Sequence, residues 1–192
     1  MSVDEFTEIE RRFLVDAREE KPWREGAERI AIRQHYGVGD LFTLQNGALC
    51  LGGHSVCSLS EDELRFLGAV ESWTTRLRQI NEAFIISYKS RIADDTAIEL
   101  EWTVDESMAR MILAKGPFPF VEKIRYVLPG PDGILWEVDE FEGALAGLVL
   151  AEVELPSSQT SVVLPAWAGH EITGLGSWSN RALAETLSKR SK

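Results

Sequence analysis

Eight short segments of this chain alternate apolar and polar residues, and most of them carry two charges separated by a single residue. Alternation with a period of two is typical of β-strands whose two faces differ in character. The strands predicted from it span residues 7–15, 29–36, 73–80, 83–91, 97–104, 120–128, 133–141 and 147–155. Charges at positions i and i+2 lie on the same face of a strand. The pattern therefore predicts a mainly β protein of the α+β class, in which one face of most strands is ionic.

The paired charges are also sorted by sign from strand to strand. The acidic pairs are Glu8/Glu10, Glu99/Glu101, Glu137/Asp139 and Glu152/Glu154, the basic pairs are Arg76/Arg78 and Lys123/Arg125, and Arg12 and Lys89 extend two further faces. A single pair of this kind fits an ordinary solvated surface. Their repetition favours an eight-stranded antiparallel barrel with these charges inside. Buried charges must be paired, hydrated or bound to ions, so the interior is predicted to be a water-filled tunnel for an ionic ligand.

Each sign of charge suggests its own ligand. Carboxylate clusters suit Mg²⁺ or Mn²⁺, which take oxygen ligands and usually bring phosphate oxygens with them. Arginine and lysine suit the phosphate oxygens themselves. The sequence has no Walker-type glycine-rich loop, the usual alternative for binding phosphates. The combination favours a metal-bound polyphosphate and hydrolysis of a phosphoanhydride bond.

Helices are few in this sequence. Ser60 and Glu63 have the spacing of a capping box at the start of a helix predicted over 60–72. Asp105 caps a second helix through about residue 115, and a short third helix follows Asn180. The 192 residues are 44% hydrophobic, which suits a single domain over 1–192 with a few flanking helices. The stretch from 37 to 53 follows no regular pattern.

The composition of the chain limits its possible binding partners and its expected cellular location. There are 20 basic and 31 acidic residues, a formal charge of −11, which argues against nucleic acid or an anionic membrane as a partner. No apolar run has the length of a signal peptide or a membrane span, so a cytoplasmic location is expected. Cys50, His54 and Cys57 provide too few ligands for a typical metal site and are interpreted as incidental. His35 and His170 are interpreted as structural or surface residues.

The charged strands resemble the CYTH domain, the family of triphosphate tunnel metalloenzymes. Glu8-Ile9-Glu10-Arg11-Arg12 resembles the ExExK signature that opens the family, and the order of the later motifs is kept over nearly the whole chain. The matching segments are Arg76-Leu77-Arg78, Lys89, Glu99-Leu100-Glu101, Lys123-Ile124-Arg125-Tyr126, Trp136-Glu137-Val138-Asp139-Glu140-Phe141, Leu150-Ala151-Glu152-Val153-Glu154-Leu155, the segment 165–173, Asn180 and Leu183.

The resemblance implies a tunnel that binds a triphosphate, most simply inorganic tripolyphosphate, and hydrolyses it with Mg²⁺ or Mn²⁺. The metal-site carboxylates it implies are Glu8, Glu10, Glu152 and Glu154, with Asp139 as an additional acid nearby. The phosphate-binding residues it implies are Arg76, Arg78, Lys89, Lys123 and Arg125. Glu8, Glu10, Arg12 and Lys89 are the catalytic candidates, and Glu99, Glu101 and Glu137 are expected to line the tunnel. The protein is expected to be a monomer or a homodimer.

Three departures from the family pattern affect the expected function. Arg12 takes the place of the signature lysine, Ala97 replaces an arginine two residues before Glu99, and the segment between Gln34 and Arg76 is longer than usual. Several alternatives to this function stay open. They are a nucleoside or thiamine triphosphatase, an adenylate cyclase, a binding module without catalysis, and a structural barrel with a solvated ionic face.

Overall fold

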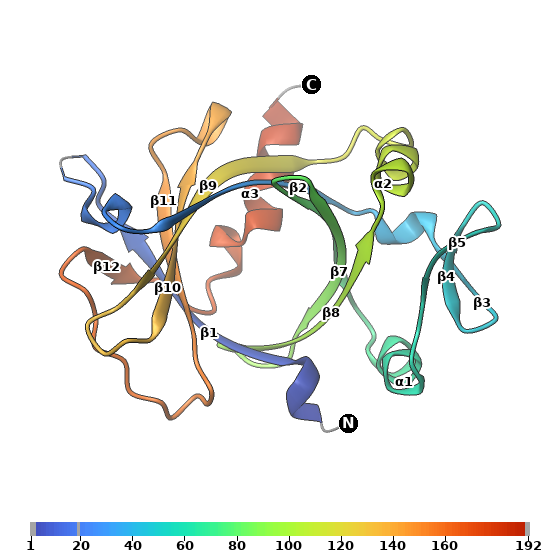
Figure 1. The fold of residues 1–192 in the computed structure, drawn as a ribbon, viewed down its shortest axis with the longest axis horizontal. Coiled ribbons are helices and arrows are strands. Elements are labelled where there is room, and N and C mark those ends of the chain that lie inside the picture. The colour runs from blue at the N-terminus through green and yellow to red at the C-terminus, as the bar shows by residue number, and fades with distance from the viewer. Residues whose placement is uncertain (1–2, 19, 191–192) are drawn as a thin grey trace.

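The computed structural model describes residues 3–18 and 20–190, and its main feature is a closed barrel of eight antiparallel strands (Figure 1). The barrel strands are β1 (Thr7–Val15), β2 (Glu28–Tyr36), β6 (Thr74–Ile80), β7 (Ala83–Arg91), β8 (Thr96–Val104), β9 (Phe120–Pro129), β10 (Leu135–Phe141) and β11 (Val149–Glu154). Each lies within two residues of the strand predicted from the sequence. The predicted eight-stranded antiparallel barrel is therefore confirmed.

The barrel closes where β1 pairs with β11, in a register that places Glu10 opposite Glu154 and Arg12 opposite Glu152. The other edge of β1 is shared by two strands. Its first residues pair with β8, and its last residues pair with β12 (Ala168–Glu171), which the sequence did not predict. A Cβ at Gly169 would lie 2.2 Å from the carbonyl oxygen of Leu14, so this close approach requires glycine.

Much of the outer face of the barrel is apolar and covered, except along β2 and the start of β9, where Arg33 and Glu122 form a surface pair, and the inner faces carry the paired charges. On one side, Phe13 and Trp136 pack with Trp23 of the 3₁₀ helix η2 (Pro22–Arg24) and with Trp167. Trp136 has no exposed surface, and burying an aromatic side chain of this size is worth about 4–6 kcal/mol. The remaining 3₁₀ helices are η1 (Val3–Phe6), η3 (Gly39–Leu41), η4 (Gly143–Leu145) and η5 (Gly176–Trp178).

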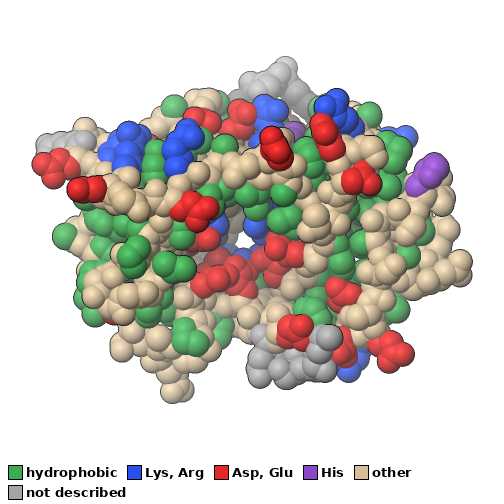
Figure 2. Space-filling view, viewed as in Figure 1, with side chains coloured by type: hydrophobic (Ala, Val, Ile, Leu, Met, Phe, Trp, Pro, Cys, Tyr) green, Lys and Arg blue, Asp and Glu red, His purple; other side chains and the backbone are tan. Residues whose placement is uncertain are grey.

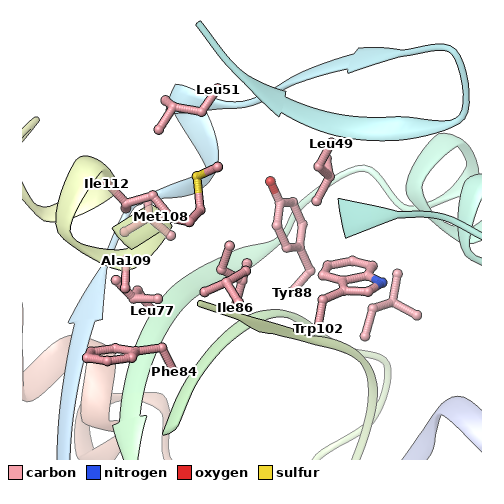
Figure 3. Packing of buried hydrophobic residues seen from close by; sticks show 13 residues of the cluster. Leu49, Leu51, Leu77, Phe84, Ile86, Tyr88, Trp102, Met108, Ala109 and Ile112 are labelled. Carbon is pink, nitrogen blue, oxygen red and sulfur yellow. The ribbon is translucent and has the colours of Figure 1, made fainter. Parts of the chain in front are cut away.

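The opposite wall, β6 to β8, is covered by two helices and by the segment that the sequence could not place. Figure 3 shows Ile86 and Tyr88 of β7 packed among Leu49, Met108 and Trp102. Helix α1 (Glu61–Ala69) begins at the predicted capping box, and α2 (Glu106–Leu113) is capped by Asp105; both end a few residues earlier than predicted. The unplaced segment and the residues just after it form a separate three-stranded sheet of β3 (Thr43–Gln45), β4 (Ala48–Leu51) and β5 (His54–Ser58).

The cysteine and histidine residues lie outside the barrel interior. Cys50 and Cys57 are free thiols on β4 and β5, and His54 is exposed at the turn between these strands. His35 stacks against Phe120 on the outer face of β2 and β9. His170 is exposed on β12.

Helix α3 (Asn180–Arg190) lies across one end of the barrel, which we call the rear (Figure 1). Ala184 of α3 packs with Val121, Phe141 and Leu150, whose side chains end the inner faces of β9, β10 and β11. This apolar contact closes the rear on the side of those three strands. No helix among the described residues has the length and the apolar character that crossing a membrane requires.

Glu140, on the outer face of β10, anchors the segment of η2. It accepts hydrogen bonds from Lys21 Nζ at 2.9 Å, Trp23 Nε1 at 3.0 Å and Arg24 Nε at 2.7 Å. Burial opposes ionisation of this carboxyl, but the hydrogen bonds from Arg24, Lys21 and Trp23 outweigh it and lower the pKa of Glu140 from 4.5 to about 2.

We expect Glu140→Gln to lower the Tm near neutral pH and to have a smaller effect in acid. Because the folded state lowers the pKa of Glu140, its stabilisation is present above about pH 4.5 and is lost as the pH falls toward 2. Thermal melts of the wild type, Glu140→Gln and the exposed control Glu142→Gln between about pH 7 and pH 2.5 would check this. A Tm difference that stays constant over this range would contradict the assignment.

Candidate active site

The interior of the barrel is a charged cavity of about 630 Å³. The acidic lining residues are Glu5, Glu8, Glu10, Glu99, Glu101, Glu137, Glu152 and Glu154, and the basic ones are Arg12, Arg76, Arg78, Lys89, Lys123 and Arg125. Every predicted site residue except Asp139 therefore lines the cavity. Figure 2 shows acidic and basic side chains gathered around a hollow in the centre of this face of the molecule. We call this open end the front.

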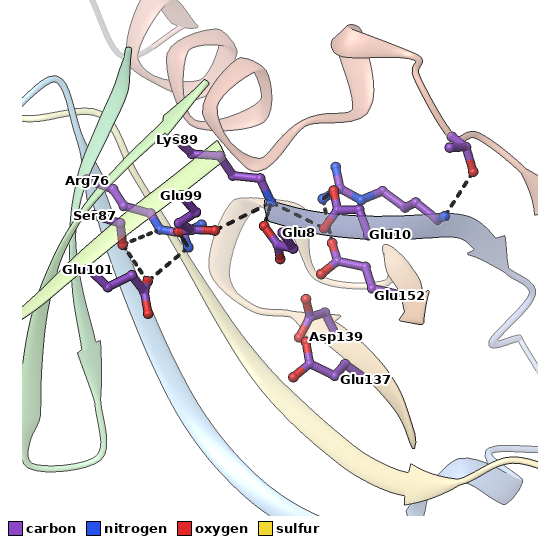
Figure 4. A network of polar contacts seen from close by, with 12 residues as sticks. Glu8, Glu10, Arg76, Ser87, Lys89, Glu99, Glu101, Glu137, Asp139 and Glu152 are labelled. Carbon is purple, nitrogen blue, oxygen red and sulfur yellow. Dashed lines mark hydrogen bonds and ion pairs between the residues drawn. The ribbon is translucent and has the colours of Figure 1, made fainter. Parts of the chain in front are cut away.

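Lys89 of β7 organises the carboxylates of the first strand. Its Nζ contacts Glu8, Glu10 at 3.3 Å and Glu99 at 3.6 Å (Figure 4). Arg12 extends the same network, with Nη2 at 3.2 Å from Glu10 and 2.7 Å from Glu152. The signature residues of β1 are thus joined to β7, β8 and β11 through two basic side chains.

A second network covers the β6 to β8 wall. Arg76 lies 2.5 Å from a carboxylate oxygen of Glu99 and donates a hydrogen bond to Ser87, which in turn donates one to Glu101. Arg78 lies farther from the same acids, at 3.9 Å from Glu99 and 3.6 Å from Glu101. Glu99 and Glu101 thus hold the two arginines in place.

A third network surrounds Asp139, which has no exposed surface. Its carboxylate bonds to Lys123 and accepts two hydrogen bonds of 2.7 Å from Arg125, which also contacts Glu137 and Glu152. Asp139 lies behind the two basic side chains and does not line the cavity. Its proximity to a metal remains a prediction; the contacts it makes are those of a residue that positions Lys123 and Arg125.

Glu154 differs from the other acids of the cavity. It is exposed, and among the described residues it has no ion pair. It lies on β11 opposite Glu10 of β1, so two carboxylates project into the cavity from neighbouring strands.

The crowding of charges shifts the pKa values of two acids, Glu8 and Glu99, in opposite directions. Burial is the main reason why the pKa of Glu8 is raised from 4.5 to about 9; Glu99 and Glu10 add to the effect, and Lys89 opposes it. Burial also disfavours the charged form of Glu99, but Arg76 and Lys89 outweigh it and lower the pKa of Glu99 to about 2. Glu8 therefore holds its proton more strongly than Glu99, although it touches a lysine.

The donor set fits a hard divalent cation in its chemistry. Carboxylate oxygens are the ligands of Mg²⁺ and Mn²⁺, and a cation beside Glu8 would favour its charged form and so oppose the effect of burial on its pKa. Within residues 3–18 and 20–190, no three acidic, histidine or cysteine side chains already converge as a ligand set. Lys89 and Arg12 contact Glu8, Glu10 and Glu152 instead.

Two polar residues of the site, Gln34 and Ser87, were not singled out from the sequence, and a third, Asn180, was named only as a motif match and as the start of a helix. Gln34 lines the cavity with 1% of its surface exposed, Ser87 links Arg76 to Glu101, and Asn180 of α3 lies at the rear. The period-two pattern carried a signal for two of them, because Gln34 and Ser87 occupy inward positions of predicted strands. No pattern within a strand identifies Asn180, since it comes from a helix.

Comparison with known proteins gives the same picture as the geometry. No protein-family model matches the chain. The chain is 33% identical over 120 residues to an inorganic triphosphatase of Acetivibrio thermocellus, covering 62% of this chain and 76% of that protein. It is 34% identical over 119 residues to an inorganic triphosphatase of Nitrosomonas europaea, covering 61% of this chain and 78% of that protein.

The fold comparison extends over more of the chain. The crystal structure of the inorganic triphosphatase NE1496 covers 92% of this chain and 93% of its own, at 28% identity and a TM-score of 0.54. The barrel, the charged interior and the two relatives support one assignment. The chain belongs to the CYTH-like triphosphatase family of hydrolases, as its sequence motifs predicted.

Proposed function

We propose that this protein hydrolyses inorganic tripolyphosphate to pyrophosphate and orthophosphate inside the barrel, with Mg²⁺ or Mn²⁺. The observation that carries the proposal is the ionic interior, in which six basic side chains face a cavity shared with eight acids. Two relatives at 33% and 34% identity are inorganic triphosphatases, which supports the same substrate class.

The basic residues would bind the phosphates by exchanging their carboxylate partners for phosphate oxygens. Arg76, Arg78, Lys123 and Arg125 are each held by a carboxylate, so their side chains are already oriented toward the cavity. Phosphate oxygens accept the same charge-assisted hydrogen bonds as carboxylates do. A triphosphate would therefore enter an arrangement of donors that needs little reorganisation, which is the condition for strong electrostatic catalysis.

The acids that would hold the metal are Glu8, Glu10, Glu152 and Glu154. A bound divalent cation would neutralise charge on the phosphate oxygens and lower the pKa of a water molecule. Asp139 would act through Lys123 and Arg125, because its carboxylate holds these two side chains in position.

Arg12 would serve as a fixed positive charge and not as a proton acceptor. Burial disfavours its charged form, but Glu152 and Glu10 outweigh that effect and raise the pKa of Arg12 above its usual value. An arginine does not lose its proton in proteins. Its role would therefore be to hold Glu10 and Glu152 in position.

The lining of the cavity favours an inorganic substrate over a nucleotide. None of the six tryptophans lines the cavity, and Phe6 is the only aromatic residue of the described chain that does. A nucleoside or thiamine triphosphatase, or an adenylate cyclase, would need a surface for an organic ring. Location in the cytoplasm and a monomeric or dimeric state stay predictions from the sequence.

We expect phosphate release from tripolyphosphate with Mg²⁺ or Mn²⁺, little from ATP or thiamine triphosphate, and none with a chelator. Parallel assays of the three substrates, with detection of cyclic nucleotide for ATP, would measure this. Tripolyphosphate binding without turnover under all conditions would contradict hydrolysis and favour a binding module. Cyclic AMP formation would favour the cyclase.

A further inference from the structure

A second cavity of about 130 Å³ lies at the rear of the barrel, beside the first turn of α3. It shares Glu10, Arg12, Arg76, Lys89 and Asn180 with the main cavity, so the two spaces meet. Its other end is lined by exposed residues, among them Arg91 and Arg181. The rear is therefore closed by α3 only on the side of β9 to β11, and on the side of β6 to β8 the interior extends to the surface.

Basic residues outnumber acidic residues around the rear cavity, in contrast to the main one. Five basic residues and three acidic residues line it, whereas six basic and eight acidic residues line the main cavity. The first turn of α3 adds the positive end of the helix dipole. A small anion is therefore favoured at the rear more than at the acidic front.

Three buried polar atoms at the rear have no hydrogen-bond partner: Arg12 Nε, the Tyr36 hydroxyl and Asn180 Oδ1. Tyr36 is 3% exposed and Asn180 is 8% exposed, and both line the rear cavity. Burial raises the pKa of Tyr36 to about 12, so the hydroxyl keeps its proton and can donate. Two donors and one acceptor are thus left for a ligand, because a buried polar group without a partner costs free energy.

Orthophosphate matches this set in size and in chemistry. The cavity has a volume of about 130 Å³, which suits a single phosphate and is small for a triphosphate. At neutral pH orthophosphate offers acceptor oxygens to Arg12 and Tyr36, and it keeps a hydroxyl that can donate to Asn180. Ala97 forms part of the wall with only a methyl group, which keeps the space open.

We propose that the rear cavity binds the orthophosphate cleaved from the substrate and releases it to solvent past Arg91 and Arg181. The proposal rests on the proposed hydrolysis of a triphosphate. Arg91 is held by the carbonyl oxygen of Gly174 at 2.7 Å, and Arg181 by Glu185 at 2.7 Å, so both guanidinium groups are fixed beside the opening. The product would thus avoid the acidic front, through which the metal-bound substrate would enter.

Isothermal titration calorimetry with orthophosphate, without turnover, tests the site directly. We expect the wild type to bind orthophosphate, Ala97→Leu to bind it about tenfold or more weakly because leucine fills the cavity, and Arg181→Gln to bind it several-fold more weakly. Ala31→Leu, on the outer face of β2, is the matched control and should bind like the wild type. Sulfate, which has no hydroxyl at neutral pH, should bind more weakly than orthophosphate.

The outcomes separate this proposal from the proposed function. Binding of orthophosphate that Ala97→Leu and Arg181→Gln leave unchanged would overturn the rear site even if tripolyphosphate is hydrolysed. Absence of orthophosphate binding by the wild type would overturn it too. If no substrate is hydrolysed but the two variants weaken orthophosphate binding as expected, the site stands as an anion site and the proposed hydrolysis fails. Because Arg181 is exposed, its variant tests the proposal even if Ala97→Leu does not fold.

Discussion

Glu154→Gln should lower kcat for tripolyphosphate by about two to three orders of magnitude while leaving the fold unchanged. Glu154 is exposed, projects into the cavity opposite Glu10 and has no ion pair among the described residues, so the substitution breaks no structural contact. It removes one negative charge from the proposed metal site. Steady-state kinetics over a range of Mg²⁺ and Mn²⁺ concentrations should show a higher metal requirement together with the loss of kcat.

The matched control for this experiment is Glu122→Gln, the same change on the outer face of the barrel. Glu122 pairs with Arg33 on the surface, where both side chains are more than one third exposed, so its loss should alter neither rate nor Tm. Full activity of Glu154→Gln would show that this carboxylate does not hold a metal that matters for turnover. The proposed metal site would then have to be rebuilt from Glu8, Glu10 and Glu152.

Asp139→Asn should produce the largest loss of stability of any single change considered for this site. The substitution keeps the shape of the side chain but leaves Lys123, which is 1% exposed, without its carboxylate partner. Breaking a buried ion pair from one side costs about 3–5 kcal/mol. For a chain of this size we expect the Tm to fall by roughly 10 °C. The KM should rise as well, since the amide nitrogen of asparagine cannot accept one of the two hydrogen bonds that Arg125 donates to Asp139.

Asp16→Asn is the control for the loss of an aspartate with an arginine partner, because Asp16 and Arg18 form an exposed pair. It should leave the Tm and the kinetics as they are. The double variant Lys123→Met with Asp139→Asn should regain stability, since it no longer buries a lone ammonium group. It should not regain affinity for the substrate. Equal Tm values for Asp139→Asn and the wild type would mean that Lys123 does not need a counter-charge.

The inner face of the barrel could be predicted from sequence because the pleat of a strand fixes it. Lys123 and Arg125 are two residues apart on β9, so both must lie on one face, and the structure places both in the cavity wall. The depth at which each side chain lies in the wall could not be predicted in the same way. Glu137 and Asp139 have the same relation on β10, yet only Glu137 reaches the cavity. Which of two neighbours is covered depends on the side chains of adjacent strands, and these were known only once the strands were paired.

The small sheet of β3 to β5 was missed although its turns were visible in the sequence. Asn46-Gly47 and Gly52-Gly53 are two-residue turns whose residues all have positive φ, between 50° and 87°. Such pairs are strong signals for tight hairpins. The strands they join have only three to five residues, too few for an alternating pattern to stand out. Strand β12 has four residues and depends on β1 for its position.

The pairing of β1 with β11 also has a consequence for the order in which this protein is made. Glu8 and Glu10 emerge from the ribosome early in synthesis, whereas Glu152 and Glu154 emerge only when most of these residues have been translated. Contacts between such distant segments form slowly, because a long loop must close first. The acids of the site therefore come together only after the rest of the barrel has been translated. A nascent or partly folded chain would lack the paired carboxylates, so it would not consume triphosphates before folding is complete.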